Sequence, residues 1–233
     1  GLQRHAEWDE IVALKNKISL KDLVTEAKEF CIQQSNINHV ELIGVTDGKA
    51  VGTYVEHKFK KYLYDKYEII LGNSASGIDL PSPEINTDIK VTSIRQPQSS
   101  CPYKSSRQKI YGLGYNLLVF VYDKHDFDNI CNLHFLNCTF VEHSRTADYT
   151  TTKRLLEMLE DDANKEDIIS YFIDKNIPGD EITYNALAEE ILLCPPKQGF
   201  LTISNALQWR LQYSRVIDLK NSIEGVLNID WRC

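Results

Sequence analysis

The sequence has no apolar run of the roughly 18 residues that a membrane-spanning helix needs. Its first residues, GLQRHAEWDE, lack the apolar core of a secretory signal peptide. It also contains no internal repeat and no low-complexity tract. The chain has 233 residues, of which 42% are hydrophobic and 25% charged. These features predict a cytoplasmic globular protein, formed by one large domain or by a core with a smaller appendage, and no membrane partner.

A compact cysteine framework is lacking as well. The six cysteines are scattered along the chain, which favours free thiols in a reducing compartment. One group has ligand types that zinc accepts, in a C-x2-H-x3-C-x4-H pattern: Cys131, His134, Cys138 and His143. Because this segment alternates like a strand, Cys131 should face away from His134 and Cys138. Zinc is therefore the less favoured interpretation, and the sequence leaves it open.

Acidic residues are absent from residues 89–122, although the whole chain has a net charge of −7. Residues 151–190, in contrast, hold 11 acids and four bases. The acid-free stretch carries five bases: Lys90, Arg95, Lys104, Arg107 and Lys109. Such a segment can form a local positive surface for nucleic acid on an acidic protein, or an ordinary solvated basic face.

Hydrophobic periodicity predicts an α/β fold with helical N- and C-terminal regions. Residues 1–45 read as helical, over EWDEIVALKNKI and over LKDLVTEAKEFCIQQ after a cap at Ser19. Residues 46–145 mix both types: helices over DGKAVGTYVEHKFKKYLYDKY and SSRQKIYGLGY, and strands over YEIILG, INTDIKVTS, NLLVFVYD and CNLHFLNCTFVE. Helices before and between strands imply a sheet covered on at least one face. Residues 146–233 read as mostly helical with a final strand in GVLNIDW, and whether they pack on the core stays open.

The C-terminal region reads as helix, turn and helix over residues 180–219, with Arg210 and Arg215 on or after the second helix. An ordinary packed helical pair is the favoured interpretation. A DNA-binding helix-turn-helix is the other.

The stretch GIDLPSPEINTDIKVTS, residues 77–93, carries candidate chemistry. Asp88 and Lys90 are two residues apart on a strand, so they project from the same face, and Asp79 precedes them. Two nearby carboxylates repel unless a cation lies between them, and hard ions such as Mg²⁺ prefer oxygen ligands. An adjacent ammonium can orient or deprotonate a water, or stabilise developing charge. The group suits metal-dependent phosphodiester hydrolysis, and the alternative is an edge strand with a polar solvent face.

The order of these elements resembles the PD-(D/E)xK nuclease superfamily, and within it the type II restriction endonucleases. That family has a helix with an acid, a strand, a first motif acid, a strand with an acid-x-Lys pair, a helix and another strand. Residues 46–125 meet this order with Glu56, YEIILG, Asp79, the Asp88/Lys90 pair, SSRQKIYGLGY and NLLVFVYD. Two positions depart from the family, because Ile78 stands where a Pro precedes the first acid and the second acid is Asp88 rather than Glu.

The resemblance implies a restriction-endonuclease-like mixed sheet flanked by helices, with residues 46–145 as the nuclease core. It implies that Asp79 and Asp88 ligate Mg²⁺, or Mn²⁺, that Lys90 serves the water and the transition state, and that Glu56 is an auxiliary acid. It also implies a homodimer that cuts double-stranded DNA at a short specific sequence. The candidate DNA-binding residues follow the catalytic strand: Arg95, Gln96, Gln98, Tyr103, Lys104, Arg107 and Lys109.

Two other functions stay open. A nuclease of the same superfamily could serve DNA repair or recombination and act on ends or junctions. A non-catalytic DNA-binding protein would instead use the C-terminal helix-turn-helix, and Asp79, Asp88 and Lys90 would then be ordinary surface residues.

Overall fold

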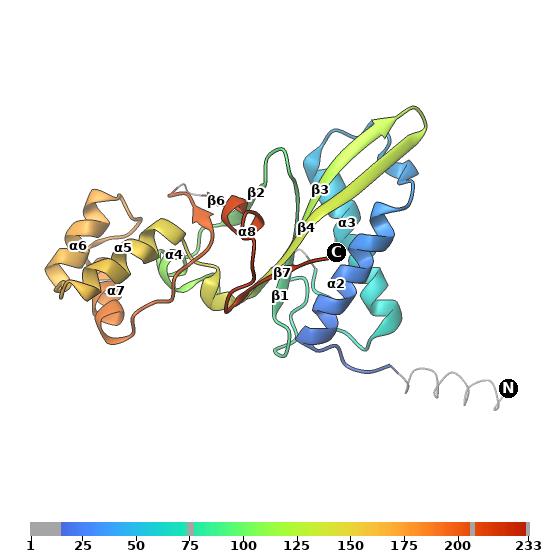
Figure 1. The fold of residues 1–233 in the computed structure, drawn as a ribbon. Coiled ribbons are helices and arrows are strands. Elements are labelled where there is room, and N and C mark those ends of the chain that lie inside the picture. Colours follow the sequence, from blue (N-terminus) through green and yellow to red (C-terminus); the bar gives the residue numbers. More distant parts are fainter. Residues whose placement is uncertain (1–14, 74–76, 206–207, 232–233) are drawn as a thin grey trace.

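The computed structural model describes residues 15–73, 77–205 and 208–231 of the chain (Figure 1). The helices are α2 (Leu20–Ser35), α3 (Gly48–Lys66), α4 (Arg107–Tyr111), α5 (Tyr149–Glu160), α6 (Lys165–Asp174), α7 (Glu181–Leu193) and α8 (Ser214–Ile217), with 3-10 turns η1 (Val40–Leu42) and η2 (His143–Arg145). The strands are β1 (Thr87–Ser93), β2 (Gln98–Pro102), β3 (Asn116–Phe127), β4 (Ile130–Val141), β5 (Thr202–Ile203), β6 (Gln208–Gln212) and β7 (Val226–Ile229).

A four-stranded mixed sheet forms the core, with strand order β1-β3-β4-β7. Strand β1 runs parallel to β3, and β4 runs antiparallel to both of its neighbours. The first half of β3, from Asn116 to Tyr122, is buried along its whole length, as expected for the central apolar strand NLLVFVYD. The predicted fold class, a mixed sheet flanked by helices, is confirmed. The final strand predicted in GVLNIDW is confirmed as β7.

Helices α2 and α3 cover one face of this sheet (Figure 1). Helix α2 begins after the predicted cap, because the Ser19 hydroxyl accepts a hydrogen bond from the backbone N–H of Asp22 at 3.1 Å. The aromatic rings of Phe30, Phe59 and Phe120 meet between helices and sheet, with centroid distances of 4.9 Å and 5.0 Å around Phe59. Ile89 of β1 belongs to the same buried cluster. This packing fixes β1 against α3, the two elements that carry the candidate acids.

The opposite face of the core sheet is covered by a three-stranded sheet with the order β2-β6-β5. Leu211 and Tyr213 are fully buried in one cluster with Leu117 and Val119 of β3. Asp88 and Thr92, which point to this side of β1, are therefore only 7% and 4% exposed. The alternative of a polar strand face open to solvent is wrong, because a second layer covers it.

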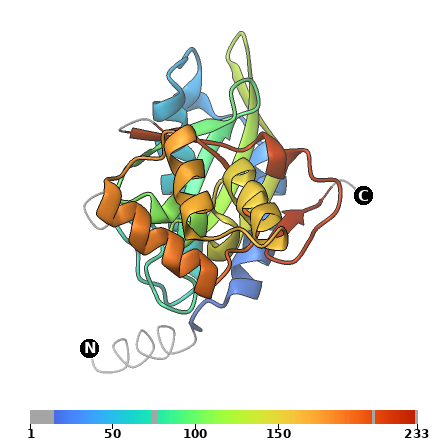
Figure 2. The same ribbon diagram turned by 90° about the vertical axis from the view of Figure 1, so that its left-hand side faces the viewer.

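The expected helical pair over residues 180–219 is wrong in its second half. Helix α7 is present, but the chain after it forms β5, β6 and the short α8. The reason is a two-residue periodicity: Leu201 and Ile203, and then Leu211 and Tyr213, are all buried on the core side. Arg210 therefore lies on a strand, opposite Ser100 of β2, and no recognition helix carries it. Helices α5, α6 and α7 form a lobe in front of the sheet in Figure 2.

Three of the expected elements differ from the structure or lie mostly outside the described residues. The segment YEIILG forms no sheet strand in the described part of the chain, because its backbone bonds to Asn16 and Asp79 in an irregular path. The helix expected over residues 105–115 shortens to α4, because Gly112 has a φ of 98°. A side chain at Gly112 would also collide with the His143 carbonyl oxygen. The helix expected over residues 7–18 lies mostly outside the described residues.

Asp148 connects the helical lobe to the second sheet. Its carboxylate accepts hydrogen bonds from Thr151 N (3.0 Å), Thr151 Oγ1 (2.6 Å) and Ile203 N (2.8 Å). The residue is 5% exposed, and its own N–H donates to the Lys109 carbonyl oxygen at 2.8 Å. One side chain thus caps α5 and holds β5.

We expect Asp148→Ala to lower the free energy of unfolding by about 2–3 kcal/mol, because it removes a cap and leaves buried donors without an acceptor. Urea unfolding measures this. Asp180→Ala is the matched control, since Asp180 caps α7 in the same way but is exposed. Equal losses in the two variants would contradict the role of Asp148.

Candidate active site

Asp79 and Asp88 are brought together by reciprocal hydrogen bonds. The backbone N–H of Asp79 donates to Asp88 Oδ1 at 3.1 Å, and the backbone N–H of Ile89 donates to Asp79 Oδ2 at 2.8 Å. Leu80 and Thr87 support this arrangement through an antiparallel bridge between the two segments. The structure thus brings together the two aspartates that the sequence singles out as candidates. Two carboxylates therefore lie side by side at the start of β1.

Helix α3 contributes an ammonium and a third carboxylate to the same place. Lys60 Nζ lies 2.6 Å from Asp79 Oδ1 and 2.8 Å from Glu56 Oε1. The side chains of Lys60 and Asp79 are 12% and 14% exposed, whereas Glu56 is 29% exposed. Glu56 is thus half-buried beside the site, and it reaches Asp79 in company with Lys60.

Lys90 lies on the other side of Asp88, with its Nζ 3.1 Å from Asp88 Oδ2. The second sheet covers it, so its side chain is only 19% exposed. Tyr213 contributes to the electrostatic environment of Lys90, and the Tyr213 hydroxyl is hydrogen-bonded to Ser99 Oγ at 2.5 Å. The side chain of Asp88 therefore sits between the candidate metal ligand Asp79 and the ammonium of Lys90.

Burial and mutual repulsion set the protonation of the acids. Burial and the hydrogen bond with Asp79 raise the pKa of Asp88 to about 7. Burial also opposes ionisation of Asp79, but its hydrogen bonds from Asp88, Glu56, Lys60 and the Ile89 N–H prevail and lower its pKa to about 2. Burial and the neighbouring Asp79 raise the pKa of Glu56. Asp88 and Glu56 are therefore harder to ionise than usual, so added positive charge would stabilise their ionised forms.

Both lysines stay charged. Burial favours the neutral form of Lys90, but the attraction of Asp88 prevails and raises its pKa above the usual range. The pKa of Lys60 is raised as well, since Asp79 and Glu56 outweigh the effect of burial. At neutral pH the site therefore contains two ammonium groups.

Sequence reasoning missed two parts of this site. Lys60 belongs to no motif of the sequence and is one of several lysines in the helix. Its four-residue spacing from Glu56 was the available signal. Tyr213 could not be found, because 114 positions separate it from Ser99, its hydrogen-bond partner.

The donor set fits a hard divalent cation. Asp79 and Asp88 offer adjacent carboxylate oxygens, which such ions prefer, and the charge on Asp88 is poorly compensated. No group of three His, Cys, Asp or Glu side chains in residues 15–73, 77–205 and 208–231 is arranged to hold a metal by itself. A cation here would rely on the two aspartates and on oxygens from water and substrate.

The candidate zinc ligands do not form a site in the described residues. Cys131 and Cys138 are both buried in the core beneath α2, whereas His134 is exposed. The expectation that Cys131 faces away from His134 is confirmed. The expectation that Cys138 shares a face with His134 is wrong, because β4 has a register shift opposite Val121 and Tyr122. Beyond this shift the alternation of its side chains is reversed, so Cys138 faces the core.

A groove of about 740 Å³ lies beside the C-terminal end of β1, next to the start of α3 and the middle of β3. Three predicted DNA-binding residues line it: Arg95, Gln96 and Gln98. Lys49 adds positive charge, whereas Lys124 is paired with Asp126 of the same lining at 2.6 Å. Arg95 is 72% exposed and lies 3.8 Å from Asp123, a loose pair that leaves the guanidinium accessible. Along β1 the lining of the groove begins at Val91, the residue directly after Lys90.

The other predicted DNA-binding residues lie on the way to the helical lobe. Lys104 is exposed and Tyr103 is half-buried. Arg107 forms a bidentate pair with Glu190 of α7, at 2.6–3.1 Å. Lys109 is 5% exposed and donates to Asn205, so its burial removes it from the set that could contact DNA directly.

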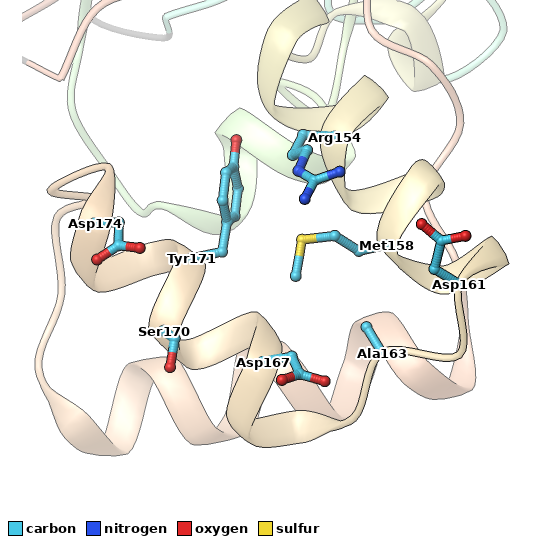
Figure 3. Close-up of a pocket in the computed structure, with 8 residues that line it drawn as sticks. All are labelled: Arg154, Met158, Asp161, Ala163, Asp167, Ser170, Tyr171 and Asp174. Atoms are coloured by element: carbon cyan, nitrogen blue, oxygen red, sulfur yellow. The ribbon is translucent and has the colours of Figure 1, made fainter.

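A second pocket, of about 370 Å³, lies between α5 and α6 in the helical lobe (Figure 3). Arg154 and three aspartates line it: Asp161, Asp167 and Asp174. Figure 1 shows this lobe on the far side of the sheet from α3. Its negative charge is unsuited to phosphate, so it plays no part in the site around Asp88.

Comparison with known proteins identifies the family. The family model described as "Type II restriction enzyme NspV" matches residues 17–228. The chain belongs to this family. Its relative from Nostoc sp., the type II restriction enzyme NspV, is 53% identical over 216 residues, which cover 91% of this chain and 96% of the relative. No solved structure matches significantly. The expected type II restriction endonuclease, a site-specific deoxyribonuclease, is thereby confirmed.

We expect the metal-free protein to lose stability as pH rises from about 4 to about 7. The folded pKa of Asp88, about 7, exceeds its ordinary 3.8, so the folded state keeps a proton that the unfolded state has released. The pKa of Asp79 is lowered to about 2, so its ionised form stabilises the folded state. This contribution is lost only as pH falls below about 4. Urea unfolding in EDTA at pH 5 and pH 7.5 measures this. Asp88→Asn should flatten the dependence, and an unchanged slope in this variant would contradict it.

Proposed function

We propose that this member of the NspV family is a Mg²⁺-dependent endonuclease that hydrolyses phosphodiester bonds of double-stranded DNA at a specific sequence. The observation that carries the proposal is the convergence of Asp79, Asp88 and Lys90 at the start of one strand, in contacts of 2.8–3.1 Å. Family membership supplies the reaction class, and this site is the group of side chains suited to it.

Asp79 and Asp88 are the proposed metal ligands. A bound Mg²⁺ would neutralise phosphate charge and activate water at this place. The backbone N–H groups of Asp79 and Ile89 hold the two carboxylates in position before any cation arrives. Mn²⁺ has the same preference for carboxylate and water oxygens, so it could replace Mg²⁺.

Lys90 is proposed as a donor rather than a base. Its ammonium keeps its proton at neutral pH, because Asp88 raises its pKa. A charged lysine can hold the attacking water by donating a hydrogen bond, and it can stabilise negative charge on the phosphate in the transition state. Glu56 acts one step away, through its contacts with Lys60 and Asp79.

DNA contacts are proposed along the groove beside β1. The groove adjoins β1 directly after Lys90, so DNA with a phosphate at Lys90 would continue toward Arg95, Gln96 and Gln98. Lys104 extends the same segment toward solvent. Arg suits phosphates and guanine, whereas Gln can pair with adenine.

The proposed assembly follows from the reaction. Cutting both strands of a two-fold symmetric site requires two active sites, so we propose a homodimer.

We propose a cytoplasmic location, where thiols stay reduced. The cysteines that the structure describes are free: Cys31, Cys101, Cys131, Cys138 and Cys194. No helix among the described residues is long and apolar enough to cross a membrane.

The alternatives have lost their support. A repair or recombination nuclease would share the fold, but the family match over residues 17–228 points to restriction. The non-catalytic alternative needed a second C-terminal helix, and β5 and β6 occupy that segment.

We expect Lys90→Ala, Asp79→Asn and Asp88→Asn each to reduce plasmid cleavage by at least about 10³-fold, because each removes charge at the reacting phosphate. Discrete fragments should appear with wild-type protein and Mg²⁺ and disappear with EDTA. Lys61→Ala is the matched control, since this exposed lysine on α3 pairs with Asp65 away from the site. Normal cleavage by Lys90→Ala would show that the site is misassigned.

Arg95→Ala should reduce the salt dependence of DNA binding by about one unit in the slope of log K against log salt, because one phosphate contact is lost. Fluorescence anisotropy with Ca²⁺ in place of Mg²⁺ measures this without cleavage. Lys165→Ala, on α6 and paired with Glu189, should leave the slope unchanged. If both variants change the slope equally, the groove is not the contact surface.

A further inference from the structure

Lys60 has all three ammonium hydrogens directed at acceptors of the active site. Its Nζ lies 2.6 Å from Asp79 Oδ1, 2.8 Å from Glu56 Oε1 and 3.4 Å from the Gly72 carbonyl oxygen. An ammonium has three donors, so these contacts satisfy it. Only 12% of the side chain is exposed. Lys60 is therefore a fixed part of the site, unlike its exposed neighbour Lys61 on the same helix.

The lysine occupies an oxygen of a proposed metal ligand. Asp79 Oδ2 accepts a hydrogen bond from the Ile89 N–H, and Lys60 Nζ lies 2.6 Å from Oδ1, so a cation bound at Oδ1 would share that oxygen with Lys60. Lys60 and a divalent ion would carry like charges within a few ångströms of each other, so they repel. Each of the two cations therefore weakens the interaction of the other with Asp79 Oδ1.

We propose that Lys60 is a built-in counter-ion that holds Asp79 until the metal arrives, and that it weakens metal binding in the absence of DNA. This inference rests on the proposed function, because it assumes that Asp79 ligates the metal. Three acids and two lysines meet in the site, namely Glu56, Asp79 and Asp88 with Lys60 and Lys90. Their near balance of charge lets the site fold without a metal.

Glu56 gives Lys60 a position to which it can withdraw. The two residues are one helical turn apart on α3, so their ion pair survives when Nζ leaves Asp79. Withdrawal needs only rotation of the long lysine side chain. Lys60 is thus a positioning residue, and Glu56 has a role that does not require it to touch the metal.

Repulsion between Lys60 and the ion would be offset when a DNA phosphate lies at Asp79 and Asp88. The phosphate adds negative charge and oxygen ligands, which favour the divalent ion over the single charge of Lys60. The free enzyme would then bind metal weakly and the DNA complex would bind it tightly. Such coupling would restrict the metal-loaded active site to enzyme that has bound DNA.

The test is a titration of DNA-free protein with Mn²⁺, in which electron paramagnetic resonance counts the free ion. We expect Lys60→Met, which keeps the unbranched chain up to the ε position but removes the charge, to bind Mn²⁺ at least about tenfold more tightly than wild type. Lys60→Arg keeps the charge and should bind no more tightly than wild type. Lys61→Met removes the same charge from the same helix and should change affinity less than about twofold.

The proposal is overturned if Lys60→Met binds Mn²⁺ no more tightly than wild type, or if Lys61→Met gives the same gain. A wild-type measurement covers the case in which Lys60→Met does not fold. The ¹⁵Nζ resonance of Lys60 should shift on addition of Mg²⁺, and an unchanged resonance at saturating Mg²⁺ would also overturn the proposal.

Failure of the proposed function itself looks different. Asp79→Asn should abolish the Mn²⁺ site in the same titration. If Asp79→Asn binds Mn²⁺ like wild type, Asp79 is not a ligand, whatever the Lys60 variants do. If Asp79→Asn loses binding and Lys60→Met gains nothing, only the role of Lys60 is wrong.

Discussion

The repulsion between buried carboxylates is the constraint around which this molecule is built. Asp79 and Asp88 are joined by a 3.1 Å hydrogen bond from the backbone of one to the side chain of the other, and Glu56 comes near through α3. Such a group is tolerable in a poorly solvated place only when cations accompany it. Lys60 and Lys90 supply that compensation from two different elements. The residual excess of negative charge makes the site ready for a divalent ion.

The rest of the fold holds this balance in place. The aromatic core around Phe59 presses α3 onto the sheet and thereby sets the position of Glu56 and Lys60. The second sheet covers the face of β1 that carries Lys90, with Tyr213 behind it. The site therefore lies where three layers meet, although all its charged groups come from residues 56–90. The groove with Arg95 continues from the same strand, so the proposed DNA contacts would lie directly beside the proposed chemistry.

The sequence predicted those parts of the fold that depend on local pattern. The alternation of apolar and polar residues around Asp88 predicts strand β1, and the hydrophobic periodicity of DGKAVGTYVEHKFKKYLYDKY predicts helix α3. Prediction from sequence failed where contacts between distant segments decide the structure. Strand β6 forms because β2 offers it a partner, and β5 pairs with β6 in turn. The segment YEIILG stays irregular because its backbone bonds to Asn16 and Asp79 instead of to a sheet strand. The position of Lys60 depends on how closely α3 approaches residue 79, which no spacing along the chain records. Arg107 and Lys109 looked like DNA contacts for the same reason, since Glu190 and Asn205 lie more than 80 positions away.

A crystal structure of the enzyme bound to its DNA site in the presence of Ca²⁺ would show whether Asp79 and Asp88 hold the metal. We expect one ion bound by the carboxylates of Asp79 and Asp88, with Lys90 beside the scissile phosphate. We also expect Lys60 to have moved from Asp79 to Glu56. An ion held by other residues, or a scissile phosphate remote from Lys90, would contradict the assignment of this site.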